Sequence, residues 1–258
     1  MGIAERLLLA LSRDPASVGA EEHRDDELEL DESLAGLRRF VPRFDEMVRD
    51  RDVLDFGCGS GRQALALAQG GARRVVGVDL DRRAIEQARA SAGRLGLDGR
   101  TEFRVAYDET LARCFDVVIS HNSMEHFGDP GLVLGMMGSA LKPGGKLVIT
   151  FGPPWYAPYG AHMWFFTQVP WVQLWFSEAT VMRVRSRYRR DGALRYEDVE
   201  KGLNRMSIAR FERLIAASGL RVDYLAYRCT KGLNFLGRIP LLRELFTTQV
   251  TCILLRPF

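Results

Sequence analysis

The residue pattern best suited to binding a ligand is a glycine-rich stretch that follows a short apolar run. Residues 53–56 (Val-Leu-Asp-Phe) lead directly into residues 57–61 (Gly-Cys-Gly-Ser-Gly). Glycines let the backbone turn tightly and approach a ligand without an obstructing Cβ atom. In a doubly wound sheet, ligands bind beyond the carboxyl ends of the strands. The pattern therefore predicts a binding loop, with Asp55, Gly57, Gly59 and Gly61 as its candidate residues.

The spacing of these glycines distinguishes two kinds of ligand. A dinucleotide fingerprint reads G-x-G-x-x-G, which Gly57 and Gly59 begin, but Arg62 stands where the third glycine is needed. A NAD-type enzyme is therefore the alternative and not the preferred interpretation. Asp79, about 20 residues further on, is placed to accept hydrogen bonds from both hydroxyls of a ribose. Its other interpretation is a helix N-cap, a role that Asp81 can fill equally well.

The elements around these residues alternate between two patterns. Strands are expected at residues 53–56, 75–79, 101–105, 115–120 and 146–151. Helical stretches lie between them, one with an apolar face of Ile85, Ala88, Ala92 and Leu95, another with Leu132, Val133, Met136, Met137, Ala140 and Leu141. This alternation predicts βαβ units, a mostly parallel sheet and helices on both of its faces.

The chain before this region shows a different pattern. Residues 3–12 are expected to form a short amphipathic helix, and residues 14–31 a polar loop. Apolar residues then recur at three- and four-residue steps, which predicts a helix that Pro42 should kink or split. They are Leu34, Leu37, Val41, Phe44 and Val48.

The last part of the chain returns to the alternating pattern. A helix is expected through Ile208, Phe211, Leu214 and Ile215, with Gly219 as its C-cap. Strands follow at residues 221–229 and 249–255. The connection between them is too short for a helical crossover with its loops, so antiparallel pairing is favoured.

Four stretches, in this order, resemble the successive motifs of class I S-adenosylmethionine-dependent methyltransferases: residues 55–61, 75–81, 115–120 and 141–147. The resemblance covers residues 33–151, and the last helix and two strands fit the family's C-terminal part. It implies an α/β fold with a doubly wound, mostly parallel seven-stranded sheet whose last strand is antiparallel. It also implies S-adenosyl-L-methionine as the cofactor and methyl transfer as the reaction.

The resemblance assigns a role to each matching residue. Gly57 and Gly59 should meet the methionine moiety of the cofactor, and Asp55 should face its amino group. Asp79 should hold the ribose hydroxyls, and Leu80 should lie against the adenine.

Two further residues extend this assignment. Asp108 is the candidate for binding the adenine amino group, although it follows Ala-Tyr where the family usually has Gly-Asp. Ser120, at the end of the fourth strand, should border the methionine end of the cofactor.

The histidines are the candidates for acid–base chemistry. Methyl transfer from a sulfonium is an in-line displacement, which needs a general base only when the acceptor must lose a proton early. His121 is the preferred catalytic candidate and His162 the second, with packing in an aromatic cluster as the alternative for His162. His126 is expected to shape the cofactor pocket. Some relatives bind a divalent metal through Glu-x-x-Glu-His here, but Asn122 replaces the first carboxylate, so no metal site is expected.

An aromatic insertion is expected at residues 152–205. Residues 147–177 contain no charged side chain and hold all four tryptophans, and five arginines follow between residues 183 and 190. The preferred interpretation is a lid that closes over the acceptor, with the arginines on its solvated side. The alternative is an interfacial element in which residues 155–190 contact a membrane. Tyr156, Tyr159 and His162 are the residues expected to touch the acceptor.

Composition limits the classes of protein. The net charge of +3 over 258 residues argues against a dedicated nucleic-acid binder. Four scattered cysteines favour a reduced, cytoplasmic protein, with membrane association under the interfacial interpretation. The expected parts are an N-terminal cap segment (1–31), a cofactor-binding core (32–151), the lid (152–205) and a C-terminal part of the core (206–258).

Together these observations predict a methyltransferase with S-adenosylmethionine as cofactor. Its expected acceptor is a small, apolar or amphipathic molecule, lipid-linked molecules included, methylated at oxygen. The hypothesis from another class is a catalytically silent cofactor-binding fold that serves as a partner subunit.

Overall fold

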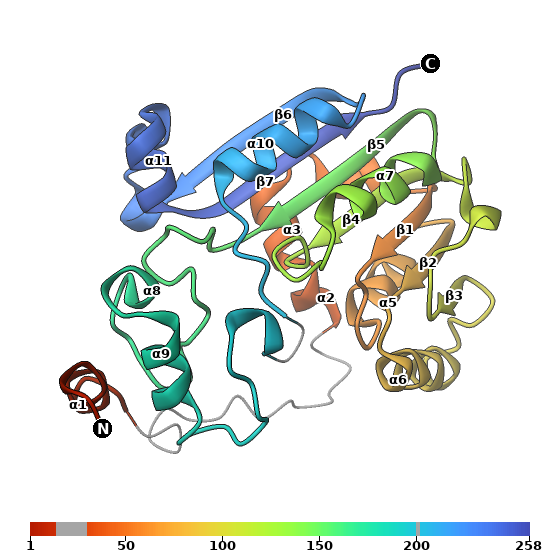
Figure 1. Ribbon diagram of the computed structural model, residues 1–258. Helices are drawn as coiled ribbons and strands as arrows, with labels where there is room; N and C mark the ends of the chain where they lie inside the picture. The colour runs from red at the N-terminus through yellow and green to blue at the C-terminus, as the bar shows by residue number, and fades with distance from the viewer. Residues whose placement is uncertain (14–29, 200–201) are drawn as a thin grey trace.

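A computed structural model describes residues 1–13, 30–199 and 202–258. A seven-stranded sheet with the order β3-β2-β1-β4-β5-β7-β6 forms its centre (Figure 1). Strands β1 to β5 pair in parallel, and β7 is antiparallel to both β5 and β6. The strands are β1 (Asp52–Phe56), β2 (Arg74–Val78), β3 (Thr101–Arg104), β4 (Phe115–His121), β5 (Leu141–Phe151), β6 (Arg221–Cys229) and β7 (Thr247–Leu255).

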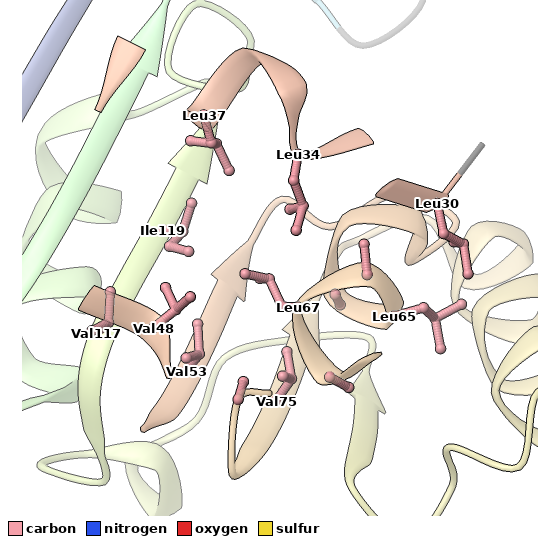
Figure 2. Packing of buried hydrophobic residues seen from close by; sticks show 14 of the residues in the cluster. Leu30, Leu34, Leu37, Val48, Val53, Leu65, Leu67, Val75, Val117 and Ile119 are labelled. Atoms are coloured by element: carbon pink, nitrogen blue, oxygen red, sulfur yellow. The ribbon is translucent and has the colours of Figure 1, made fainter. Parts of the chain in front are cut away.

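Helices cover both faces of this sheet, as the βαβ pattern predicts. One face is covered by α3 (Ala35–Phe40), α4 (Phe44–Val48), α5 (Arg62–Gln69) and α6 (Arg82–Arg94). The other face is covered by α7 (Pro130–Ala140) and α10 (Ile208–Ala217). Figure 2 shows Val53, Val117 and Ile119 on the first face, with Leu37 and Val48 packed against them. Alternating strand residues thus supply two separate apolar cores.

Most expected elements are confirmed, with three differences. Pro42 does split the N-terminal helical pattern, into α3 and α4. The expected loop at 14–31 lies largely outside the described residues, but its last two positions already belong to α2 (Leu30–Ser33), which packs against α5. Strand β5 begins at Leu141, five residues early, because Leu141 pairs with Phe115 before the register shifts. The connection from β6 to β7 contains a short helix, α11 (Pro240–Phe246), that periodicity missed.

The apolar face expected for α7 is partly wrong. Leu132 is 58% exposed, whereas Leu134, outside the expected face, is buried. This helix is apolar on nearly every side, so its periodicity contains little information about which face meets the sheet.

Residues 152–205 build a third core of their own. Helices α8 (Val172–Trp175) and α9 (Glu178–Arg185) supply part of it, and Phe166 and Tyr196 are fully buried within it. Figure 1 shows this part on the side toward which the arrowheads of β4 and β5 point. Because ligands of this fold class bind beyond the carboxyl ends of the strands, the insertion stands on the ligand side.

Helix α1 (Ile3–Ala10) belongs to the same core. The Leu8 side chain is fully buried in it, and α1 packs against α9. Glu5 forms an ion pair with Arg183 at 2.6 Å, and Ser12 forms a β-bridge with Thr167. The apolar core of the insertion therefore includes a helix from the N-terminal end of the sequence.

One arginine of the insertion lies inside it, which corrects the expectation that this series is solvated. The Arg185 side chain is 2% exposed, and its Nη1 and Nη2 donate to the Asp191 carboxylate at 2.7 and 2.5 Å. Residues two apart point to different faces of a helix. Arg183 and Arg185 of α9 therefore point to different sides of this helix, and only one of those sides faces solvent.

Among the described residues, no helix combines the length and apolar character required to cross a bilayer. All four cysteines are free thiols.

Truncating Leu8 tests how α1 is held. Leu8→Ala should lower the free energy of unfolding by about 2–5 kcal/mol, the range for removing a buried leucine side chain from a packed core. Leu7→Ala is the matched control on the same helix, because Leu7 is 53% exposed. Urea denaturation followed by tryptophan fluorescence measures both. Equal midpoints for the two variants would contradict the packing of α1 on the insertion.

Candidate cofactor and acceptor site

The loop after β1 turns back against the end of β2. The backbone N–H groups of Gly57 and Cys58 both donate to the carbonyl oxygen of Val78, at 2.8 and 3.1 Å. Gly57, Gly59 and Gly61 have φ values of 85°, 53° and 80°. Glycine adopts this left-handed region without the steric cost that a Cβ atom brings. The three glycines therefore provide the sharp path from strand to helix.

Two of these glycines have different surroundings. A Cβ atom on Gly61 would lie 2.7 Å from Ala88 and from Phe103, so this position packs the loop against α6 and β3. A Cβ atom on Gly59 would meet nothing within 4 Å. Gly61 is required by packing, whereas Gly59 borders open space in which a ligand can approach the backbone.

Asp79 fastens this loop to the second strand. Its Oδ2 accepts a hydrogen bond from Gly59 N at 2.7 Å, and its Oδ1 accepts one from Asp81 N at 2.9 Å. The N-cap of α6 is Asp81, whose side chain accepts from Arg83 N and Ala84 N. The capping role thus falls to Asp81, and Asp79 remains beside the glycine loop.

Asp55 is a buried carboxyl group with half of its hydrogen-bonding capacity unused. It is 1% exposed, and its Oδ1 accepts from Gln63 Nε2 at 3.0 Å. No partner for its Oδ2 is found among the residues that the structure describes. Burial, and secondarily the Asp79 charge, raise the pKa of Asp55 to about 7. An orphaned oxygen of this kind is the group that a ligand cation would satisfy.

The other residues expected at the cofactor are more dispersed. Leu80 is 82% exposed at the end of β2. Asp108 accepts a hydrogen bond from Thr110 N as the cap of a short helical turn, and forms an ion pair with Arg104 at 3.2 Å. The Ser120 side chain is fully buried. It also lies on the opposite face of β4 from His121, because strand residues alternate.

His121 packs beneath the N-terminal helices. Its Nδ1 lies 2.5 Å from Thr150 Oγ1 of β5, and a Cβ atom on Gly36 of α3 would lie 3.2 Å from its ring. Ser123, two residues further on, lies 3.5 Å from Gly57 O, so the loops after β1 and β4 meet. Burial lowers the pKa of His121 to about 4, which leaves the imidazole neutral at pH 7.

The structure brings His162 to the chain segment after β4. Its ring and that of His126 are 5.8 Å apart between centroids and nearly perpendicular. His162 has a φ of 54°, and its Nε2 lies 3.3 Å from Pro153 O. Burial lowers its pKa to about 4. His162 thus packs against another ring, as the aromatic-cluster interpretation expects, and that ring is a second histidine.

Tyr156 and Tyr159, the other expected acceptor residues, lie on the same loop. Tyr159 stacks on Trp164 with ring centroids 4.1 Å apart. Tyr156 is 42% exposed, and its carbonyl oxygen accepts a hydrogen bond from Trp171 Nε1. The tyrosines are thus tied to the tryptophans of the insertion.

Two polar residues of this region were not among the predicted site residues. Gln63 is the donor to Asp55, and its position in the first turn after the glycine loop was the available signal. Glu125 is 2% exposed with an Oε2 that has no partner within the described part of the chain. Its burial was not visible in a sequence where it reads as one polar residue of a loop.

Comparison with known proteins identifies the fold and one domain within the chain. An S-adenosylmethionine-dependent methyltransferase from Mesorhizobium loti superimposes with a TM-score of 0.56 over 86% of this chain and 96% of that one, at 19% identity, a likeness of fold. A family model described as a methyltransferase domain matches residues 48–153. The chain contains a class I S-adenosylmethionine-dependent methyltransferase domain.

The curated relatives match less than half of this chain. A ribosomal protein L11 methyltransferase from Shewanella piezotolerans is 33% identical over 102 residues, 40% of this chain and 34% of that protein. A ubiquinone biosynthesis O-methyltransferase from Idiomarina loihiensis is 36% identical over 112 residues, 42% of this chain and 45% of that protein. The chain thus spans about a third to under a half of the length of these relatives. The range matched by the family model, residues 48–153, holds the glycine loop and ends at the start of the insertion.

Proposed function

We propose that this chain is an S-adenosylmethionine-dependent methyltransferase that methylates an oxygen atom of a small, apolar or amphipathic acceptor, lipid-linked molecules included. The observation that carries the proposal is the glycine loop, pinned by Asp79 and bordered by the orphaned carboxylate oxygen of Asp55. The residues that follow are assigned roles on this basis.

The cofactor site is built from three chemical features. The Asp55 carboxylate suits the ammonium group of S-adenosylmethionine, because a buried acceptor without a partner gains most from a cation. Gly59 leaves room for the ligand to lie against the backbone. Asp79, with Leu80 beside it, would receive the ribose and adenine by exchanging its bond with Gly59 N for the hydroxyls.

The neighbouring strand ends complete the proposed binding residues. Gly57 and Gly61 shape the loop, Asp108 stands beyond β3, and Ser120 supports the end of β4.

The histidines would act on the acceptor. When bound, S-adenosylmethionine supplies a methyl group on a sulfonium, and in-line displacement depends mainly on positioning and on exclusion of water. His121 and His162 are both neutral at pH 7 because burial lowers their pKa values to about 4. A neutral imidazole can accept a hydrogen bond, or a proton, from an acceptor hydroxyl. We assign His162, with Tyr156 and Tyr159, to the acceptor side.

Support for a small amphipathic acceptor comes from the insertion. It places an aromatic core on the ligand side of the sheet, where a lid would exclude water. The Idiomarina relative is named as a ubiquinone biosynthesis O-methyltransferase, which favours oxygen as the methylated atom. The Shewanella relative is named for a protein acceptor, so a protein substrate is the competing possibility.

Replacing Asp79 tests whether the residues at this loop bind S-adenosylmethionine. Asp79→Ala should weaken S-adenosylmethionine binding by about 1–3 kcal/mol, the range for hydrogen bonds to a charged group. Asp81→Ala is the control, since it removes the cap of α6 but no proposed cofactor contact. Isothermal titration calorimetry measures both. If wild-type protein fails to bind S-adenosylmethionine, the methyltransferase proposal is wrong. If it binds but transfers no methyl group to any acceptor class, the silent-subunit hypothesis gains.

Asp55 predicts a proton linked to cofactor binding. Its raised pKa means that the carboxyl is mostly protonated below pH 7, and pairing with an ammonium group favours the ionised form. Binding should therefore release a proton, and affinity should rise between about pH 5.5 and 7 as the carboxyl ionises. Titrations in buffers of different ionisation enthalpy measure this release. Asp55→Asn should abolish it, and an unchanged release in that variant would remove Asp55 from the site.

A second contact, with a membrane surface, is favoured by exposed apolar side chains near α1 and α8. Ile3 is 88% exposed and Trp175 is 72% exposed. Helices α1 and α8 both contact α9, and the exposed Arg6 of α1 would meet anionic head groups. Two anchoring helices bind a bilayer more firmly than one.

Co-sedimentation with anionic vesicles tests this contact. Wild-type protein should sediment with them at low salt, and Trp175→Ser should reduce the bound fraction severalfold by removing buried aromatic area. Leu132→Ser is the control, because Leu132 is exposed on α7, which packs on the sheet and not on the core that contains α1. Equal losses in both variants, or no binding by wild type, would leave the insertion as a lid alone.

A further inference from the structure

Three side chains with metal-binding groups converge between the segments that follow β4 and β5. One ring nitrogen each of His126 and His162 and one carboxylate oxygen of Glu125 lie within 4.8 Å of one another. Glu125 and His126 come from the segment after β4, and His162 comes from the loop after β5, 36 residues later in the sequence. The sequence-based expectation of no metal site considered only the segment after β4, where Asn122 removes a carboxylate. The tertiary structure supplies a different third ligand.

Second contacts orient both histidine rings. His126 Nδ1 lies 2.7 Å from the carbonyl oxygen of Gly202, so Nδ1 carries the proton and the lone pair is on Nε2. His162 Nε2 lies 3.3 Å from Pro153 O, which in the same way assigns the lone pair to Nδ1. Metal-ligating histidines characteristically donate their other ring N–H to a carbonyl or carboxylate. Each ring thus has one nitrogen next to a backbone carbonyl, the arrangement that is typical of metal-ligating histidines.

Glu125 provides an independent indication of a missing ligand. Its side chain is 2% exposed, and Oε1 makes one long contact, 3.4 Å from Gly152 N. Its Oε2 has no hydrogen-bond partner among residues 1–13, 30–199 and 202–258. A buried carboxylate oxygen without a donor is costly, and a cation at this point would satisfy it.

We propose that Glu125, His126 and His162 bind one divalent transition-metal ion, with Zn²⁺ as the preferred ion. Two imidazoles and one carboxylate are a ligand set of catalytic zinc sites, which keep a further position open. Tetrahedral zinc at its usual bond lengths places ligand atoms roughly 3.3 Å apart, so the three groups need to approach by no more than about 1.5 Å. Side-chain rotation provides a movement of this size.

A small cavity of about 120 Å³ is lined by both histidines and would admit a group that binds at the open position. Its walls include the two histidines with Met163, Phe165 and Arg189. Arg185 also lines it, but the bidentate pair with Asp191 offsets that charge. If the proposed function is correct, an acceptor hydroxyl bound at this position would ionise more readily, its proton leaving to water. This consequence rests on the proposed function, whereas metal binding itself does not.

The test is metal binding by the full chain. Metal-depleted protein is titrated with Zn²⁺ against a chromogenic chelator, and with Co²⁺ by visible absorption, which reports the ligand geometry. We expect one ion per chain in wild type. His126→Ala, His162→Ala and the nearly isosteric Glu125→Gln should each lower the affinity by at least about 10-fold, the least expected when even a hydrogen-bond partner of a metal ligand is removed.

His121→Ala is the matched control, because it removes a buried histidine that lies outside the cluster. It should retain one ion with wild-type affinity. Binding that persists in all three ligand variants, or is lost equally in the control, would overturn the site, as would no binding of either ion by wild type. S-adenosylmethionine titration of the same samples checks folding. Wild type that binds metal but no S-adenosylmethionine contradicts the proposed function and leaves this inference intact.

Discussion

The contact between the Asp79 carboxylate and the backbone N–H of Gly59, at 2.7 Å, joins the first two strands of the sheet at their carboxyl ends. The loop can reach Asp79 because three glycines adopt positive φ and because Val78 O accepts two N–H groups. Gly61 then packs tightly on Ala88 and Phe103, which orients the start of α5. The contact places a carboxylate, a glycine backbone and the buried Asp55 within one small region.

The two-sided burial of the sheet makes this region rigid. Residues such as Val53 and Leu54 alternate between the two apolar cores, so β1 is held from both faces. At the opposite ends of the strands, Lys142 bridges Asp52 of β1 and Asp116 of β4 at 2.8 and 3.0 Å. A polar cluster there ties three strands together, while the carboxyl ends are left to meet a ligand.

The insertion follows a different physical logic. Its aromatic side chains form a third core that excludes the sheet but includes Leu8 of α1. Arg185, buried in a bidentate pair with Asp191, is part of its framework. The insertion therefore packs around its own apolar residues and places His162 beside the segment after β4. The polar groups that meet there, Glu125 and His126 among them, belong to a boundary between two independently packed cores.

Local sequence was sufficient to locate the sheet and the glycine loop, because both depend on patterns between residues close together in the chain. Alternation of apolar residues located the strands, and glycine and aspartate at fixed spacing marked the loop and the end of β2. Where a pattern carried little information, as in the uniformly apolar α7, Leu132 was assigned to the wrong face and Leu134 was missed. The prediction that the arginines of the insertion are solvated was wrong for Arg185 for a similar reason, since helical geometry turns this side chain inward.

The sequence by itself determined the class of fold and the position of the glycine loop, since both depend on residues close together in the chain. The tertiary structure alone decided which distant groups meet: α1 with the insertion, Gln63 with Asp55, and His162 with Glu125 and His126. These contacts join segments through side-chain packing and burial, which leave no regular spacing in the sequence. The glycine loop could be predicted from the amino-acid sequence, but the burial and hydrogen-bond partners of Asp55 and Glu125 could be determined only from the tertiary structure.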